Sequence, residues 1–217
     1  MKIGIIGATG MAGSAIFKAA QEEQFDVTAI VRNSDKAYKL LGNNINILEK
    51  DAFDLTRIDI QNFDIIVNAF ATSPDKAYLH IDLASKLVSL LRNTSEPRLI
   101  FILGAGSLYT GNGDDQHLLF EDIQKDSSTA AWRTIPENQL YELEFLQNVK
   151  NVNWTGISPG VTFVSGKSSD EILYGTDFLL KDSEGKSETT SGTMAKAILK
   201  EIKQPEHLKT RFTVVNG

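Results

Sequence analysis

The sequence alternates short runs rich in Ile and Val with longer segments whose apolar residues recur at helical spacing. The short runs are predicted strands, at Lys2–Ile6, Val27–Val31, Ile45–Leu48, Ile65–Asn68, Leu99–Leu103 and Trp154–Ile157. The longer segments are predicted helices, at Met11–Glu23, Ser34–Leu41, Tyr78–Leu91 and Glu137–Asn148. Such alternation is typical of crossover units, so we predict an α/β fold with a doubly wound parallel sheet.

The pattern changes after Pro159. "FLLKDSEGKSETT" predicts a hairpin around Ser183–Gly185, and "SGTMAKAILKEI" predicts a helix capped by Ser191 or Thr193. "RFTVV" predicts a final strand. We therefore expect this part of the chain to form a small α+β lobe.

The domain organisation follows from length and periodicity. No internal repeat or low-complexity linker divides the 217 residues, so we expect one domain over 1–217, to which 159–217 contribute a lobe on the substrate side. Residues 104–136 have weak periodicity. Because connections this long are usually functional or contain short helices, we expect a substrate lid there.

A glycine motif, "GATGMAG", follows the first strand and opens the first helix. In that context Gly7 allows a tight turn, Gly10 lets the backbone approach a pyrophosphate, and Gly13 lets the helix pack closely on the sheet. Thr9 and Met11 of the same motif are further candidate contacts. The motif predicts a Rossmann-like dinucleotide site, although a plain strand-to-helix turn would also use small residues.

Arg32 stands at the end of the second strand, where an acidic side chain would bind the adenosine ribose hydroxyls of NAD. A guanidinium cannot accept a hydrogen bond from a hydroxyl, but it pairs well with a 2′-phosphate. Ser34 and Lys36 could contact the same phosphate. The sequence therefore favours NADP(H) over NAD(H), with a solvated surface charge as the alternative role of Arg32.

Composition and charge exclude several functions. The chain has no Cys, which excludes disulfides and Cys-ligated metals, and its net charge of -6 disfavours nucleic acid. We expect no metal site, because the acidic residues Asp114 and Asp115 lack calcium-loop spacing. Of the three histidines only His117 is a candidate site residue, and a solvated loop histidine is its alternative role. The sequence shows neither a secretory signal nor a long apolar run, so we expect a cytoplasmic protein without a membrane partner.

Motifs along nearly the whole chain carry a resemblance to known proteins. With "GATGMAG", "VRNSDK", "DAFD", "VNAFAT" and "SPG", and with a tail that includes "EIKQPEH" and "RFTV", the chain resembles the atypical short-chain dehydrogenase/reductases. It is most similar to the NADH-flavin-reductase-like and biliverdin-reductase-like branch, which is grouped with NmrA-like NAD(P)-binding proteins.

The resemblance implies further cofactor contacts at strand ends: Asp51, Ala52, Asn68, Ala69, Phe70, Ser158, Pro159 and Gly160. The first two would lie against the adenine, the next three along the central stretch of the cofactor, and the last three over the nicotinamide. The carboxyl ends of parallel strands are also where ligands bind in open α/β sheets. A turn or helix cap is the alternative role of Asp51.

Catalytic relatives in this family use a Ser after the fifth strand and a Tyr followed by a Lys four residues later. Ser107 is the candidate Ser here, with Tyr109 close by, and Tyr141 lies on the expected helix but is followed by Phe145. Because a Tyr without a neighbouring cation is a poor proton relay at neutral pH, the Tyr–Lys mechanism does not carry over.

These observations lead to an NADPH-dependent oxidoreductase that transfers hydride to a flavin or similar planar substrate held over Ser107. Such a reaction can take its proton from water. The apolar walls around the acceptor could be formed by Tyr109, Trp132 or Phe163. A non-catalytic dinucleotide sensor of the NmrA-like type is the alternative. A sugar-nucleotide epimerase-like reductase is disfavoured by the missing Tyr–Lys pair. The physiological acceptor and the oligomeric state remain open.

Overall fold

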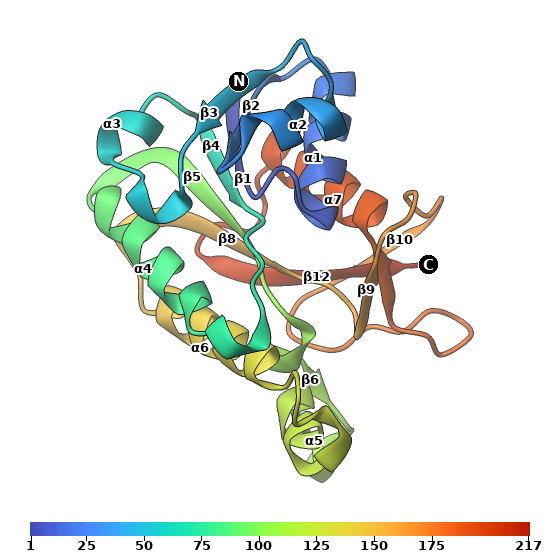
Figure 1. Ribbon diagram of the computed structural model, residues 1–217. Coiled ribbons are helices and arrows are strands. Elements are labelled where there is room, and N and C mark those ends of the chain that lie inside the picture. Colours follow the sequence, from blue (N-terminus) through green and yellow to red (C-terminus); the bar gives the residue numbers. More distant parts are fainter.

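An eight-stranded sheet forms the centre of the molecule (Figure 1). The computed structural model describes all residues 1–217. The strand order of the sheet is β10-β12-β8-β5-β4-β1-β2-β3. The strands are β1 Lys2–Ile6, β2 Asp26–Val31, β3 Asn46–Glu49, β4 Ile65–Asn68, β5 Thr94–Ile102, β8 Val152–Ser158, β10 Ile172–Gly175 and β12 Thr210–Asn216. All neighbours pair in parallel except β10, which runs antiparallel to β12. This topology confirms the predicted doubly wound sheet.

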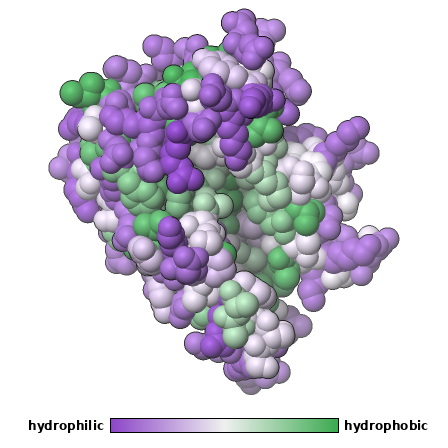
Figure 2. Space-filling model, viewed as in Figure 1, coloured by the Kyte–Doolittle hydropathy of each residue, from purple (hydrophilic) through white to green (hydrophobic).

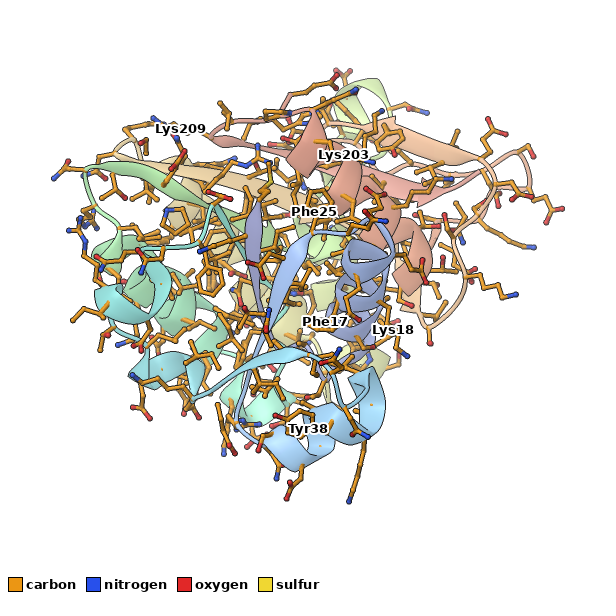
Figure 3. The ribbon with its side chains drawn as sticks, turned by 90° about the horizontal axis from the view of Figure 1, so that it is seen from above. Phe17, Lys18, Phe25, Tyr38, Lys203 and Lys209 are labelled. Atoms are coloured by element: carbon orange, nitrogen blue, oxygen red, sulfur yellow. The ribbon has the colours of Figure 1, made fainter.

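Helices cover both faces of this sheet (Figure 1). They are α1 Met11–Glu22, α2 Ser34–Leu41, α3 Arg57–Ile60, α4 Leu79–Leu90, α5 Leu119–Lys125, α6 Thr134–Gln147 and α7 Ser191–Lys203. On one face α1 packs against α7, and on the other α4 packs against α6. Seen from above, α1 with Phe17 and Lys18 lies beside α7, whose Lys203 forms an ion pair of 2.8 Å with Glu23 (Figure 3).

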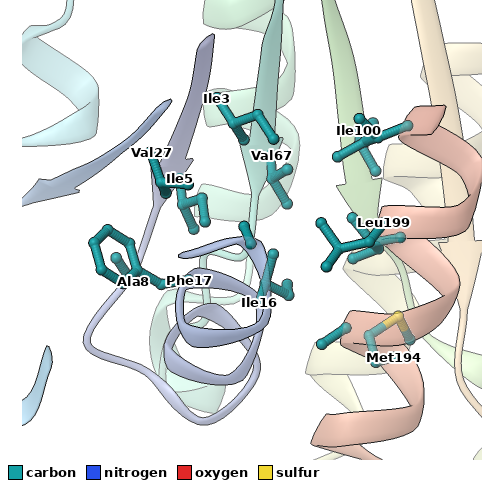
Figure 4. Close-up of a cluster of buried hydrophobic side chains, with 14 of the residues drawn as sticks. Ile3, Ile5, Ala8, Ile16, Phe17, Val27, Val67, Ile100, Met194 and Leu199 are labelled. Carbon is teal, nitrogen blue, oxygen red and sulfur yellow. The ribbon is translucent and has the colours of Figure 1, made fainter. Parts of the chain in front are cut away.

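Two apolar cores lie between the sheet and these helix pairs. Ile3 and Ile5 belong to the core under α1 and α7, together with Phe17 and Leu199 (Figure 4). Trp154 belongs to the core under α4 and α6. Because the strands are buried on both faces, they read as continuous apolar runs in the sequence, and each large side chain stabilises the fold by about 2 kcal/mol.

The region between β5 and α6 contains more structure than its weak periodicity indicates. It holds the short strands β6 Tyr109–Thr110 and β7 His117–Leu118, which pair with each other, and then α5. Short elements of this kind bury few residues, so they leave little periodic signal. Figure 1 shows this segment projecting from the end of the sheet.

Two details of the C-terminal part were predicted wrongly. Ser183–Gly185 lies in a turn closed by Asp182, but the flanking strands do not pair as a hairpin, because β11 Glu188–Thr190 pairs in parallel with β9 Thr162–Val164. The cap of α7 is Thr190, whose hydroxyl accepts from the backbone N–H of Thr193 at 3.2 Å. The Thr193 hydroxyl is itself engaged with Asn216 at 2.6 Å, so it is not free to cap the helix.

Residues 159–217 are closely joined to the rest of the molecule. They supply β12 and β10 to the central sheet and α7 to one of its faces. The pair β9 and β11, with the loop between β10 and β11, extends beyond the sheet (Figure 1). No helix combines the length and the apolar character needed to cross a bilayer.

Candidate functional site

The turn between β1 and α1 requires glycine at two of its positions. Gly7 has φ +75°, and a Cβ there would lie 2.6 Å from the carbonyl oxygen of Ala69. A Cβ on Gly13 would collide with the carbonyl oxygen of Gly7. The motif therefore allows the first turn of α1 to lie directly against the end of β1.

The N-terminus of α1 offers unpaired hydrogen-bond donors. Gly10 is the N-cap and has no capping side chain, and the amide N–H groups of Met11, Ala12 and Gly13 have no acceptor within the protein. These donors coincide with the positive end of the helix dipole, where anions bind favourably. The turn thus has the features that a dinucleotide pyrophosphate requires.

A polar cavity of about 520 Å³ lies at the carboxyl ends of β1, β2, β3 and β4. The sequence-predicted residues that line it are Gly7, Thr9, Gly10, Arg32, Asp51, Ala52, Ala69 and Phe70. The carboxylate of Asp51 also accepts from the N–H of Phe53 at 3.0 Å, so it caps the short turn Ala52–Asp54, as the alternative interpretation proposed.

Positive charge gathers around this polar cavity although the protein is acidic overall. Arg32, Lys36, Lys50 and Lys76 line it, against the single carboxylate of Asp51. Lys50 is paired with Asp59 at 2.8 Å, whereas the Arg32 guanidinium forms no ion pair within the protein.

Ser34 does not line the cavity. Its backbone N–H donates to the Glu49 carboxylate at 3.2 Å, which places an acidic side chain close to the end of β2.

An apolar cavity of about 390 Å³ continues from the polar one, and the two share Gly10 and residues 69–72. The sequence-predicted residues that line it include Met11, Ala69, Phe70, Pro159, Gly160, Trp132 and Phe163. No Lys, Arg, Asp or Glu lines this cavity. Figure 2 shows a hollow where apolar residues gather between hydrophilic borders. The two cavities together form one groove with a charged end and an uncharged end.

Three predicted cofactor residues lie beneath this groove instead of lining it. Gly13 sits under the β1–α1 turn, and Asn68 is buried, with its side-chain oxygen accepting from the N–H of Phe70 at 3.3 Å. Ser158 is buried, and its hydroxyl accepts from Arg211 Nη1 at 3.1 Å. These residues position the lining segments without facing the groove themselves.

Ser107 is buried and does not line either cavity. Its hydroxyl donates to the carbonyl of Gly104 at 3.3 Å and accepts from Arg211 Nη1 at 3.2 Å. Arg211, a buried side chain from β12, also pairs with Asp177 at 2.7 Å. Sequence reasoning missed Arg211, for which the only signal was a lone cation within the apolar run of the last strand.

Neither candidate tyrosine faces the groove. Tyr109 is partly exposed, and its ring lies 5.9 Å from that of Phe178. The Tyr141 hydroxyl lies on the surface and donates to Glu137 at 3.2 Å. Partial burial and the adjacent Glu137 raise the pKa of Tyr141, so it is a weaker acid than an isolated phenol.

His80 lines the groove, whereas the candidate site residue His117 does not. His117 lies in the projecting segment, bonded to Asp122 at 2.9 Å and to the carbonyl of Asp115 at 2.6 Å, and lines neither cavity. His80 of α4 does line the apolar cavity, although it is only 3% exposed. The sequence places it in the apolar stripe of a helix, where a histidine usually packs in the core.

His80 has a buried carboxyl group beside it. Its Nδ1 atom lies 3.7 Å from Glu142 Oε2 of α6, and neither carboxyl oxygen of Glu142 has a hydrogen-bond partner. Burial lowers the pKa of His80 to about 4 and raises that of Glu142 well above 4.5. Burial therefore favours the uncharged form of both groups.

Comparison with known proteins gives matches over the whole chain. A sequence model of the family described as NAD(P)H-binding matches residues 7–205. A Bacillus subtilis (strain 168) protein named "Uncharacterized protein YwnB" is 38% identical over 218 residues, 100% of this chain and 99% of the relative.

Two solved structures agree with this match. The crystal structure of a protein from Lactobacillus casei is 39% identical, with a TM-score of 0.93 and 100% of both chains covered. A protein of Streptococcus pneumoniae TIGR4 whose structure is named "a putative NADH-flavin reductase" is 28% identical, with a TM-score of 0.87 and again 100% of both chains covered.

Proposed function

Because the chain belongs to the NAD(P)H-binding family, we propose that it is an oxidoreductase that prefers NADPH and passes hydride to a flavin or similar planar acceptor. The observation that carries this proposal is the continuity of the two cavities: Gly10, Ala69 and Phe70 line both. A dinucleotide that lies along the polar cavity would bring its nicotinamide to the apolar one. The name given to the Streptococcus pneumoniae relative is consistent with a flavin as acceptor.

The charges of the polar cavity support the preference for NADPH. The 2′-phosphate would lie near the end of β2, where Arg32 has no competing ion pair and Lys36 lies close along the chain. A guanidinium binds a phosphate through paired, charge-assisted hydrogen bonds. Glu49 opposes this preference in part, since its carboxylate is held at Ser34.

The residues of the groove would bind and orient the dinucleotide and the acceptor, and they would exclude water from them. The free N–H groups at the start of α1 would hold the pyrophosphate, and the apolar walls with Trp132 and Phe163 would hold the acceptor ring. A bound reduced nicotinamide supplies a hydride to an acceptor in contact with it. Because no charged side chain lines the apolar cavity, an uncharged ring is the acceptor that it fits best.

The test is turnover of NADPH, followed by its absorbance, with riboflavin, FMN or an uncharged quinone as acceptor. We expect turnover, with kcat/KM for riboflavin at least equal to that for FMN, because the FMN phosphate finds no cation in the apolar cavity. We expect Phe163→Glu to lower kcat/KM for the acceptor about tenfold or more while the affinity for NADPH is unchanged. The matched control is Phe178→Glu, at an exposed Phe outside both cavities.

A non-catalytic sensor of the NmrA-like type is a second candidate, favoured by one observation. The three residues that sequence reasoning selected for catalysis, Ser107, Tyr109 and Tyr141, all lie outside the groove. Tight binding of NADPH without turnover of any acceptor would favour the sensor over the reductase.

A further inference from the structure

His80 is the only residue with an ordinary titratable side chain among those that line the apolar cavity. The polar side chains Thr72 and Gln139 line it too, but neither a hydroxyl nor an amide exchanges protons readily near neutral pH. The phenyl ring of Phe70 packs edge-on against the imidazole, with ring centroids 5.5 Å apart, and so fixes its plane. The imidazole forms no hydrogen bond within the protein, and with Nδ1 beside Glu142 its Nε2 atom is the nitrogen left to act on a ligand.

Glu142 does not line the apolar cavity, and it is 1% exposed. A buried carboxyl group with two unpartnered oxygens costs stability, and an apolar residue of similar size would avoid that cost. Buried polar groups are nearly always hydrogen-bonded, so the unpartnered carboxyl group of Glu142 needs a functional explanation. A decrease of about 0.5 Å in its separation from His80 Nδ1 would bring the two within hydrogen-bond range.

We propose that His80 donates the proton that completes reduction of the acceptor, and that Glu142 is a positioning residue that orients the imidazole and restores its proton. This inference rests on the proposed function, because it assigns the second half of the same reaction. It identifies the acceptor as a ring that carries a basic atom, such as a quinone oxygen or a flavin ring nitrogen.

The transfers balance as follows. With the hydride the acceptor gains a hydrogen and two electrons while the nicotinamide is oxidised, which leaves a negative charge on the acceptor. The Nε2–H bond of His80 then breaks as its proton moves to that charged atom. The O–H proton of Glu142 moves to Nδ1, so that the imidazole is neutral again, with its proton on the other nitrogen. After the product leaves, water in the open cavity returns one proton, and the original arrangement is restored.

Two isosteric substitutions test this role by activity. We expect His80→Gln to lower kcat about 100-fold, the low end of the usual contribution of a general acid, and Glu142→Gln to lower it about tenfold. The KM for NADPH should be unchanged in both. Imidazole added to a His80→Ala variant should restore part of kcat. The matched controls are His117→Gln, at a histidine paired with a carboxylate outside the cavities, and Glu144→Gln, at an exposed position of α6.

Spectroscopy of the free protein gives a readout that does not depend on turnover. We expect a carboxylic-acid C=O stretch in the infrared spectrum at neutral pH that is absent from Glu142→Gln and present in Glu144→Gln. The 15N resonances of His80 should show a neutral ring with its proton on Nε2, and this tautomer preference should weaken in Glu142→Gln.

The outcomes separate the two proposals. An inactive wild-type protein overturns both the reductase and the relay. An active wild-type protein whose kcat is unchanged in folded His80→Gln and Glu142→Gln overturns the relay alone. A fall in kcat without rescue of His80→Ala by imidazole, together with no infrared band from Glu142, would also overturn it and leave a structural role for the pair.

Discussion

At the scale of a single residue, the proposed preference for NADPH rests on Arg32. It follows the last residue of β2 and lines the polar cavity without an ion pair. Glu49, at the end of the neighbouring β3, accepts from the N–H of Ser34, so a cation and an anion both lie close to the end of β2. A 2′-phosphate would meet the cation, and a 2′-hydroxyl needs an acceptor that Arg32 cannot provide.

We predict that Arg32→Ala weakens NADPH binding about 10- to 100-fold, the usual range for loss of a charge-assisted pair. Binding of NADH should change little, because it lacks the phosphate. Calorimetric titration of both cofactors measures the difference, and Arg92→Ala, at an exposed arginine before the opposite end of β5, is the control. An equal loss for both cofactors would assign Arg32 to another part of the dinucleotide.

Residues differ in how far their places in the groove could be predicted from the sequence. The glycines and Arg32 could be, because their positions relative to β1 and β2 follow from local spacing. Ser107 could not, since its hydroxyl is engaged by Arg211, which lies far along the chain. The proximity of His80 and Glu142 depends on how α4 packs against α6, and no local pattern carries that information.

At the scale of elements, the periodicity predicted most strands and helices to within a few residues because each buries apolar side chains regularly. It failed where hydrogen bonds between distant segments decide the structure. The strands that flank the turn at Ser183–Gly185 pair with other strands, β10 with β12 and β11 with β9, and the hydroxyl of Thr193 bonds to Asn216. Pairing of this kind is set by the assembled sheet, which the local sequence does not encode.

The contact of α1 with the preceding turn provides a test at this scale. An exposed helical Gly→Ala substitution usually stabilises a protein by up to about 1 kcal/mol. At Gly13 the new methyl group would collide with the Gly7 carbonyl, so we predict that Gly13→Ala destabilises the protein by about 1 to 3 kcal/mol and weakens binding of both cofactors. Urea unfolding and cofactor titration measure these effects, with Ser14→Ala as the control. A more stable Gly13→Ala would mean that α1 can move away from β1 without loss.

At the scale of the whole molecule, the topology explains why one groove can combine two kinds of surface. The parallel strands β1 to β5 all end at the same edge of the sheet, so the charged residues after β2 and β3 lie beside the apolar segments after β4 and β5. The C-terminal segment adds Pro159, Gly160 and Phe163 to the apolar side. Helices α4 and α6 form a further wall, and their contact buries the pair His80 and Glu142.

This buried pair gives global stability two opposing dependences on pH. The folded pKa of His80 is about 4 against an ordinary 6.5, so the unfolded chain holds the extra proton between these values, and stability rises with pH in that window. The folded pKa of Glu142 lies above 4.5, so the folded protein holds the extra proton above that value, and stability falls as pH rises. The two effects oppose each other where their pH windows overlap, and the effect of His80 ends at 6.5.

We therefore predict that Glu142→Gln becomes progressively more stable than the wild-type protein as pH rises from about 4.5 toward the raised pKa of Glu142, with the difference growing by up to about 1.4 kcal/mol for each pH unit. The amide cannot ionise in the unfolded chain. The variant therefore lacks the ionisation of Glu142 that favours unfolding of the wild-type protein as pH rises. Urea unfolding across this range measures the difference, and Glu144→Gln should show no such growth because its carboxylate is exposed. A difference that stays constant with pH would mean that Glu142 ionises in the folded protein, and it would then be unable to hold a proton for His80.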